Sequence, residues 1–426
     1  MFQSMPKMYL PRYFNRIVLF ICILMGRLDN YSAQQYLSVS GMKLTLHGEK
    51  VFLSGMNQAW YSYGADFGND GYAKSKPHLM TTLDAIRQNG GNSIRIWVHV
   101  VGVNTPQFND TGHVVGPGAN LTRDLQDFLW EARSRNILVT FSLWNGAALT
   151  KALPLYSVLT DRSVLQSYLE NALTPLVRAL KSEVGLGIWE IINEPEGSMQ
   201  MGMDDKEQPC YDTSTIHIWD GADWTGLGIP LKDILAFVAL QADTIHKEDP
   251  KALVTVGSWT YKTISDQLSR RNFYSDKCLQ EVAGGSVTAR LDLYQIHTYD
   301  TLHLYLPHDP FMVNASVYKL EKPVIIGEFS QKRGASMTSP GQFNWAYYHG
   351  YSGSWSWSAL GSDDAADSLE VQESGIRSLQ NKNEQNFGGR VNFTLNSSSK
   401  QRIVSLTKNV LVGIQELWKK LIAILI

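Results

Sequence analysis

Two glutamates, Glu194 and Glu328, each stand at the end of an apolar segment that is typical of a buried strand. The segments are residues 187–193 and 323–328, and Asn193 directly precedes the first glutamate. A pair of carboxyl groups about 5–5.5 Å apart can hydrolyse a glycosidic bond, one attacking the anomeric carbon and the other protonating the leaving oxygen. The two groups must differ in environment, so that one stays ionised and the other protonated. One buried carboxyl group alone would mean little, because it could equally be the structural partner of an arginine.

Eight apolar segments alternate with amphipathic stretches of helical length from residue 51 onward. The predicted strands are residues 51–57, 93–99, 137–143, 187–193, 253–258, 291–297, 323–328 and 352–358, and the predicted helices include 77–89, 121–135, 161–182, 231–248 and 366–380. Eight strands that alternate with helices predict an α/β protein with a single (β/α)₈, or TIM, barrel. A doubly wound open sheet is disfavoured, because no G-x-G-x-x-G turn follows the first strand.

Polar and aromatic residues gather where the predicted strands end, which in a TIM barrel is the side of the active site. These residues are Asn57, His99, Trp144, Asn145, Asn193, Glu194, Ser258, Trp259, His297, Thr298, Tyr299, Glu328 and Trp357. The two glutamates end strands four and seven, which face each other across the mouth of such a barrel. We therefore predict that Glu194 and Glu328 meet in one site.

Several short motifs on these strands resemble a known enzyme family. They are GMNQAWYSYGADFG (55–68), SIRIWVH (93–99), WEIINEP (189–195), QIHTY (295–299), IGEF (326–329) and SWSWS (354–358). The last four resemble glycoside hydrolase family 5 of clan A, and the first two look more narrowly like its invertebrate endo-β-1,4-mannanases. The resemblance covers residues 36–380 and implies a retaining enzyme that cleaves internal bonds of mannan, glucomannan or galactomannan.

The resemblance implies a role for each matching residue. Glu194 matches the acid/base and Glu328 the nucleophile. Asn193 would bind the 2-hydroxyl group of the sugar, a contact that strengthens in the transition state. Arg95 would keep Glu328 ionised, since a nearby guanidinium favours the charged form. Tyr299 would donate a hydrogen bond to the nucleophile.

The same resemblance places further side chains around the sugar. His297 would help to set the acid/base. Trp357 would form the floor of the subsite at the cleavage point, although Trp355, on the same strand face, is a close alternative. Trp60 is predicted to bind substrate as well.

The end of the third strand departs from the family pattern. Many members carry a histidine there, where residues 143–145 read Leu-Trp-Asn. This makes Trp144 a candidate sugar platform, and His99 either supplies the missing polar contact or is a plain core or rim histidine. Of the two glutamates that flank the acid/base, we interpret Glu190 as an interior partner for a cation and Glu196 as a rim residue.

Composition narrows the possible partners. The formal net charge is −2, so there is no basic excess for binding nucleic acid. The histidines lack the spacings of a zinc site, and we expect no metal and no cofactor. A β-mannan polysaccharide is the expected partner of a monomer that needs no other protein. Two alternatives stay open, a β-1,4-glucanase or similar glycanase and a non-catalytic polysaccharide-binding protein. Mannose and glucose differ only in the axial or equatorial 2-hydroxyl group, and the sequence does not distinguish them.

The N-terminus predicts secretion. Lys7, Arg12 and Arg16 precede an apolar run over residues 17–25, which is shorter than the roughly 18 residues that span a bilayer. We interpret residues 1–33 as a signal peptide, with a signal anchor as the alternative.

Removal of this segment would leave two cysteines, Cys210 and Cys278. An even number in an oxidising compartment favours one disulfide over two free thiols. Cys210 lies in a long insertion, residues 199–229, that we expect to wall one side of the cleft. Sequons for N-glycosylation also fit secretion, at Asn109, Asn120, Asn314, Asn392 and Asn396.

The chain ends in a segment outside the barrel pattern, residues 381–426. Residues 381–400 are polar, and residues 401–426 predict a basic amphipathic helix. Such a helix could lie on a membrane surface or dock on the barrel. It could equally be an atypical chain end, so its role stays open.

Overall fold

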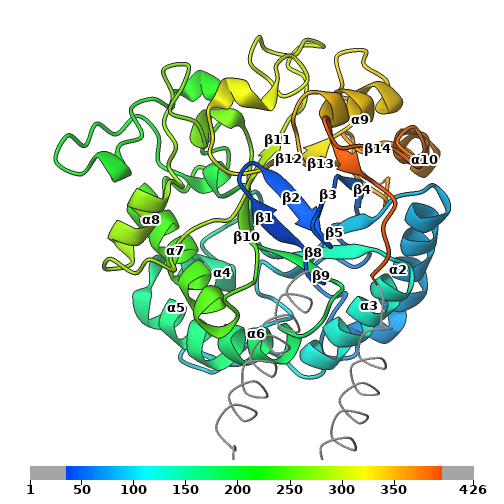
Figure 1. The fold of residues 1–426 in the computed structure, drawn as a ribbon. Helices are drawn as coiled ribbons and strands as arrows, with labels where there is room; N and C mark the ends of the chain where they lie inside the picture. Colours follow the sequence, from blue (N-terminus) through cyan, green and yellow to red (C-terminus); the bar gives the residue numbers. More distant parts are fainter. Residues whose placement is uncertain (1–34, 362, 396–426) are drawn as a thin grey trace, which may run out of the picture. The chain divides into compact units, whose positions relative to one another are not determined.

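The computed structural model describes residues 35–361 and 363–395, in which eight parallel strands close into a barrel surrounded by helices (Figure 1). Around the barrel the strand order is β10-β11-β12-β13-β4-β5-β8-β9. The bounds are β4 Leu53–Asn57, β5 Ser93–Val100, β8 Leu138–Asn145, β9 Leu186–Asn193, β10 Val254–Ser258, β11 Tyr294–His297, β12 Val324–Phe329 and β13 Gly353–Ser356. The predicted fold class and each predicted strand are confirmed.

Helices and short turns of helix connect the strands. Their bounds are α2 Gly71–Gln88, α3 Leu121–Ser134, α4 Pro154–Thr160, α5 Arg162–Tyr168, the π-helix η1 Leu169–Leu173, α6 Thr174–Leu180, α7 Leu231–Glu248, α8 Asp276–Val282, α9 Ser339–Tyr348 and α10 Leu369–Arg377, with 3₁₀ turns η2 Pro195–Ser198, η3 Pro209–Tyr211, η4 Ile218–Asp220, η5 Tyr261–Thr263 and η6 Ala315–Tyr318. Three helices are not among the segments that the sequence pattern singled out. α4 and α8 are too short to show a helical period, and the buried face of α9 includes Ser339 and Gln342.

The barrel interior contains a charged layer. Glu190, fully buried on β9, accepts hydrogen bonds from Arg95 on β5, with distances of 2.5 and 2.6 Å. Ser142 and Gln295 each donate to it at 2.8 Å. Gly257 makes room for this group, since a Cβ atom there would lie 2.7 Å from Glu190 Oε1. The interior partner for a cation predicted at Glu190 is therefore present, and it holds Arg95 beneath the barrel mouth.

A small sheet lies across the other end of the barrel (Figure 1). It consists of β1 Ser38–Ser40, β2 Lys43–Leu46 and β3 Glu49–Lys50, while β6 Gln107–Phe108 pairs with β7 Val114–Gly116 beside the mouth-side end of β5. Leu37, just before β1, is buried and shares a small cavity with Leu253, just before β10, and with Trp189. The sheet therefore seals the end at which the barrel strands begin.

The folded unit extends past residue 380, the boundary that we predicted, to Phe393. A hairpin of β14 Asn383–Glu384 and β15 Gly389–Arg390 follows α10, and Arg390 forms a bridge with Val51. Val391 is fully buried, and Tyr347 donates to the Gly389 carbonyl at 2.7 Å. Residues 381–393 thus pack on the barrel although their composition is polar.

Two predicted segments, the signal peptide 1–33 and the amphipathic helix 401–426, lie outside the described residues. In the part of the chain that the structure covers, every helix is too short or too polar to cross a membrane.

Candidate active site

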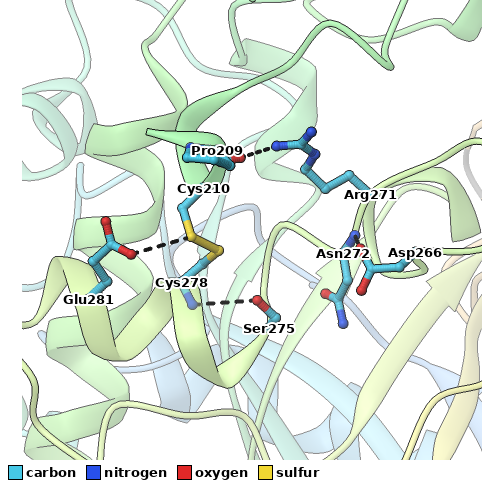
Figure 2. The surroundings of a disulfide bond; sticks show 8 residues. All are labelled: Pro209, Cys210, Asp266, Arg271, Asn272, Ser275, Cys278 and Glu281. Carbon is cyan, nitrogen blue, oxygen red and sulfur yellow. Dashed lines mark hydrogen bonds between the residues drawn. A yellow bond between two sulfur atoms is a disulfide. The ribbon is translucent and has the colours of Figure 1, made fainter. Parts of the chain in front are cut away.

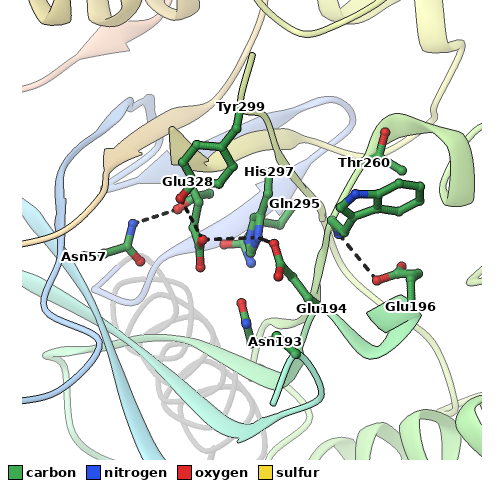
Figure 3. A network of polar contacts seen from close by, with 12 residues as sticks. Asn57, Asn193, Glu194, Glu196, Thr260, Gln295, His297, Tyr299 and Glu328 are labelled. Carbon is green, nitrogen blue, oxygen red and sulfur yellow. Dashed lines mark hydrogen bonds and ion pairs between the residues drawn. The ribbon is translucent and has the colours of Figure 1, made fainter. Parts of the chain in front are cut away.

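The two predicted glutamates come together at the mouth of the barrel (Figure 3). Glu194 directly follows β9, and Glu328 lies near the end of β12. One carboxylate oxygen of each lies within 4.8 Å of the other and of a ring nitrogen of His297. This separation falls in the range of a nucleophile and an acid/base, and well below the roughly 6.5–9.5 Å that leaves room for a water molecule between two carboxyl groups.

Glu194 is aimed by an unusual backbone conformation. Its φ of 42° and ψ of 56° lie in the left-handed region, which non-glycine residues rarely adopt. Its N–H donates to the carbonyl of Gly257 on β10 at 2.7 Å, which holds this conformation. Such conformations cost about 1–3 kcal/mol and concentrate at functional sites. The turn directs the carboxyl group to His297, whose Nδ1 lies 2.8 Å from Glu194 Oε1.

Two side chains donate hydrogen bonds to Glu328. Arg95 Nη1 donates to its Oε1 at 2.6 Å, and the Tyr299 hydroxyl donates to its Oε2 at 3.0 Å. Burial raises the pKa of Tyr299 well above its usual value, so this hydroxyl keeps its proton. His297 Nδ1 lies 3.6 Å from Oε2, between the two carboxyl groups.

The carboxyl groups differ in their electrostatic surroundings. Burial raises the pKa of Glu194 to about 7, and burial lowers the pKa of its partner His297 to about 4, so that imidazole is neutral at pH 7. Burial also raises the pKa of Glu328, but there the directly bonded Arg95 guanidinium, which stays charged, opposes the rise. At neutral pH the pair can therefore hold its proton on Glu194 while Glu328 is the anion.

Arg95 uses all of its N–H groups on protein acceptors. Nε and one N–H of Nη2 bind Glu190, and the second N–H of Nη2 binds Asn193 Oδ1 at 2.7 Å. Nη1 binds Glu328 and, at 2.9 Å, Asn57 Oδ1. A guanidinium has five N–H groups, so none is left for substrate. Its part is to fix the groups around it.

Glu194, His297 and Glu328 also offer the ligand types of a metal site. Their atoms already satisfy one another, however, through the contact between Glu194 and His297 and through the bond from Arg95 to Glu328. A guanidinium in contact with Glu328 opposes the approach of a second cation. The arrangement suits proton transfer and nucleophilic attack better than metal binding.

An aromatic cluster adjoins the pair. The ring centroid of Trp357 lies 5.8 Å from that of Trp60, and Tyr299, which binds Glu328, packs against the same cluster. The Trp357 indole N–H donates to Asp363 Oδ2 at 2.8 Å. Trp355 is fully buried, with its N–H on Ser93 Oγ, so Trp357 is the tryptophan that can form a subsite floor.

Trp144 is not a sugar platform, contrary to our prediction. Its ring is fully buried outside the barrel strands, where its N–H donates to Gln241 on α7 at 3.2 Å. His99 is buried beside it, with Nδ1 on Thr105 Oγ1 at 2.9 Å and ring contacts to Trp144 and Tyr168. Of the two predicted possibilities for His99, the core histidine is the correct one. Burial accordingly lowers its pKa to about 3.

Glu196 is a buried residue, and its predicted place on the rim was wrong. Its Oε1 accepts hydrogen bonds from Thr263 at 3.0 Å and from Tyr274 at 2.9 Å, and Oε2 accepts from the Trp259 N–H at 3.4 Å. Burial raises its pKa to about 7. The carboxyl group thereby joins the turn after Glu194 to the segment after β10.

Three side chains near the pair were missed or left without a role in the sequence. Asn145, at the end of β8, accepts a hydrogen bond from Asn193 and donates one to the Tyr63 hydroxyl. Asp363 holds the Trp357 indole. Tyr63 and Asp363 lie in loops away from the glutamates in sequence. Tyr63 belongs to the family motif at residues 55–68, which could have drawn attention to it, whereas Asp363 lies in none of the motifs.

The insertion after β9, which we predicted to wall one side of the cleft, contacts the turn that follows Glu194. Trp224 packs on Gly197, at which a Cβ atom would lie 2.4 Å from the indole, and the indole N–H donates to the Ala147 carbonyl at 2.8 Å. The Trp224 side chain is still half exposed, and its ring lies 6.4 Å from that of Trp259. These two indoles lie along the turn that follows Glu194.

A disulfide between Cys210 and Cys278 ties this insertion to α8, which confirms the predicted pairing (Figure 2). The two Cα atoms are 5.3 Å apart, within the range that a disulfide spans. Arg271 reinforces the link with a hydrogen bond to the Pro209 carbonyl and an ion pair with Asp212 at 3.1 Å.

Loss of the bond is expected to affect binding more than chemistry. In the Cys210→Ser/Cys278→Ser variant, the freed insertion should raise the KM for long substrates with kcat less affected, because uniform binding is lost. The bond closes a loop with a sequence separation of 68, which stabilises the fold by about 4 kcal/mol in the chain-entropy model. Kinetics and urea unfolding of both forms measure the two effects. A kcat that falls as far as kcat/KM would contradict a role in binding alone.

The barrel and its carboxyl pair define a glycoside hydrolase. Comparison with protein-family models finds no match. The chain is 44% identical over 326 residues to the mannan endo-1,4-β-mannosidase of Mytilus edulis. The aligned residues cover 76% of this chain and 88% of the relative. It is 39% identical over 369 residues to the enzyme of the same name from Cryptopygus antarcticus, 85% of this chain and 95% of the relative.

Solved structures agree with this relationship. The endo-1,4-β-mannanase of Eisenia fetida superposes with a TM-score of 0.82 at 43% identity, covering 85% of this chain and 99% of that one. The chain therefore belongs to the family of mannan endo-1,4-β-mannosidases, and the resemblance noted in its motifs is confirmed.

Proposed function

We propose that this chain hydrolyses internal β-1,4-mannosidic bonds of mannan, glucomannan or galactomannan by a retaining double displacement. The observation that carries the proposal is the pair Glu194 and Glu328, with oxygens within 4.8 Å of each other at the mouth of the barrel. The names of the relatives supply the substrate class.

In the first step, an oxygen of Glu328 attacks the anomeric carbon as the bond to the leaving oxygen breaks. The proton of Glu194 passes to that oxygen, which leaves as a free hydroxyl group. In the second step, Glu194, now ionised, takes a proton from water, whose oxygen displaces Glu328 from the anomeric carbon. Two inversions return the β configuration, and both carboxyl groups return to their starting states.

The surrounding residues support these two steps. Arg95 and Tyr299 hold the Glu328 carboxylate and stabilise its charge. Asn193, buried beside the pair, binds the 2-hydroxyl group of the sugar, and Trp357 with Trp60 supplies an apolar face for its ring. Every group comes from one chain, in keeping with a monomeric enzyme.

Secretion is part of the proposal. The Cys210–Cys278 bond supports it, because disulfides persist in oxidising compartments. Exposed asparagines in four sequons are available for N-glycosylation, namely Asn109, Asn120, Asn314 and Asn392. N-terminal sequencing and glycosidase treatment of protein from the culture medium of a eukaryotic host test both points. A product retained inside the cells would reject secretion.

The substrate is tested by reducing-sugar release from galactomannan and from carboxymethylcellulose. We expect release from galactomannan, and ¹H NMR of an early time point should show the β-anomer as the first product. Release from carboxymethylcellulose alone would favour the glucanase alternative, and binding without release would favour the non-catalytic one. A first product with the α-anomer would reject double displacement.

The pH profile should report on Glu194. Its pKa of about 7 means that the acid form is lost as the pH rises through neutrality, so kcat/KM should fall on the alkaline side near pH 7. The Glu194→Ala variant should keep partial turnover of aryl mannosides with activated leaving groups, which need no protonation, and should lose the alkaline limb. Stopped assays from pH 4 to 9 measure both. An unchanged alkaline limb in the variant would assign it to another group.

A further inference from the structure

A chain of hydrogen bonds crosses the mouth of the barrel from the nucleophile to its rim. Arg95 Nη2 donates to Asn193 Oδ1 at 2.7 Å, and Asn193 Nδ2 donates to Asn145 Oδ1 at 3.0 Å. Asn145 Nδ2 then donates to the hydroxyl of Tyr63 at 3.1 Å. Arg95 also binds Glu328, so the chain connects an exposed tyrosine to the reacting carboxylate.

The directions of these bonds are fixed from both ends. Arg95 can only donate, so the Asn193 atom facing it is the oxygen, and the nitrogen of that amide faces Asn145. The Asn145 atom that accepts must then be its oxygen. Independently, the backbone N–H of Ala147 donates to the same oxygen at 3.1 Å, which requires the same assignment. Two donors of fixed type therefore impose a single orientation on both amides.

One N–H of the Asn193 amide remains for a ligand. Nδ2 carries two hydrogens, and the bond to Asn145 uses one of them. Because Oδ1 is held by Arg95 and Nδ2 by Asn145, the plane of the amide cannot rotate. Asn193 and Asn145 are 2% and 3% exposed, so water cannot replace a lost partner easily. The second N–H of Asn193 Nδ2 therefore points in one fixed direction.

We propose that Asn145 is a positioning residue for the reaction, which aims the free N–H of Asn193 at the 2-hydroxyl group of the sugar being cleaved. This inference rests on the proposed function. The 2-hydroxyl contact strengthens as the sugar ring flattens in the transition state, so an amide free to turn would lose transition-state stabilisation rather than binding alone. The orientation of the same hydroxyl group distinguishes mannosides from glucosides. By orienting the Asn193 amide, Asn145 therefore contributes to the selectivity between these two substrates.

The test compares two substrates, an aryl β-mannobioside and its analogue that lacks the 2-hydroxyl group on the ring next to the aryl group. In the Asn145→Ala variant, kcat/KM for the first should fall roughly 10- to 100-fold, less than for loss of a catalytic donor itself. The 2-deoxy analogue has no group for Asn193 to bind, so its kcat/KM should change little. The fall should lie mainly in kcat, since a transition-state contact is lost.

The Asn145→Asp variant serves as the conservative control. A carboxylate oxygen there can still accept from Asn193 Nδ2 and from the Ala147 N–H, while the Tyr63 hydroxyl turns to donate. Its ratio of rates on the two substrates should stay close to the wild-type ratio, and it provides the readout if the alanine variant does not fold.

Equal losses on both substrates in Asn145→Ala, or a collapsed ratio in Asn145→Asp, would overturn the positioning role while leaving the mannanase assignment intact. A wild-type chain inactive on both substrates and on galactomannan would overturn the proposed function, and this inference with it.

Discussion

The Glu328→Gln variant is expected to lose about 10⁴-fold or more in kcat, as other enzymes do when a nucleophile is removed. The change removes the group that we propose forms the covalent intermediate, but it preserves the size of the side chain. Its carbonyl oxygen still accepts from Arg95, and the Tyr299 hydroxyl turns to accept from the new amide. Mannan oligosaccharides should therefore still bind. Steady-state kinetics and isothermal titration of mannohexaose measure the two quantities separately.

Glu196→Gln provides a matched control for this experiment. Glu196 is also a fully buried glutamate of the barrel mouth, but its hydrogen bonds go to Thr263, Tyr274 and the Trp259 N–H rather than to the pair. Its kcat should fall far less. Mass spectrometry after incubation with a 2-deoxy-2-fluoro mannoside should locate the trapped sugar on the wild-type peptide that contains Glu328. A label on another peptide would contradict its role as nucleophile.

The Arg95→Met variant is expected to lose both activity and stability. Its removal leaves Glu190, which is fully buried, without its only cationic partner among the described residues. Breaking a buried ion pair from one side costs about 3–5 kcal/mol. Urea unfolding should show this loss, and kcat should also fall, because Glu328 and Asn193 lose the donors that fix them.

A double variant separates the two effects. In Arg95→Met/Glu190→Gln the buried charge is removed together with its partner, so most of the stability should return, as when an ion pair is replaced by neutral groups of similar volume. Activity should not return, because Glu328 still lacks the guanidinium. Recovery of activity together with stability would mean that Arg95 acts on folding alone.

The residues predicted best from the sequence are those that a strand end and a motif identify together. Glu194, Glu328, Asn193, His297 and Tyr299 all lie at or just beyond the C-terminal ends of β9, β11 and β12, and a closed barrel brings such ends to one mouth. Their meeting at one site could therefore be predicted without knowing the conformations of the loops.

At the site, the predictions that were wrong concern the direction or burial of a side chain. Trp144 stands at the end of β8 as a sugar platform should, but it points outward to α7, and the next residue, Asn145, points to the site instead. Alternation along a strand is clear only where polar and apolar residues differ, and both faces of β8 are buried. Glu196 is buried although charged residues are rarely buried without a partner. Its hydroxyl partners, Thr263 and Tyr274, come from a distant segment.

The disulfide also affects how this enzyme would respond to a protease. Because Cys210 and Cys278 are joined, residues 210–278 form a covalent ring that includes all of α7 and β10. A single cut within this ring leaves both pieces attached, so a nicked enzyme remains one molecule until the bond is reduced. While the bond is intact, β10 and Gly257, whose carbonyl holds the backbone of Glu194, would stay in place. If the chain is secreted as we propose, it would keep working after a protease cleaves its exposed turns between these cysteines.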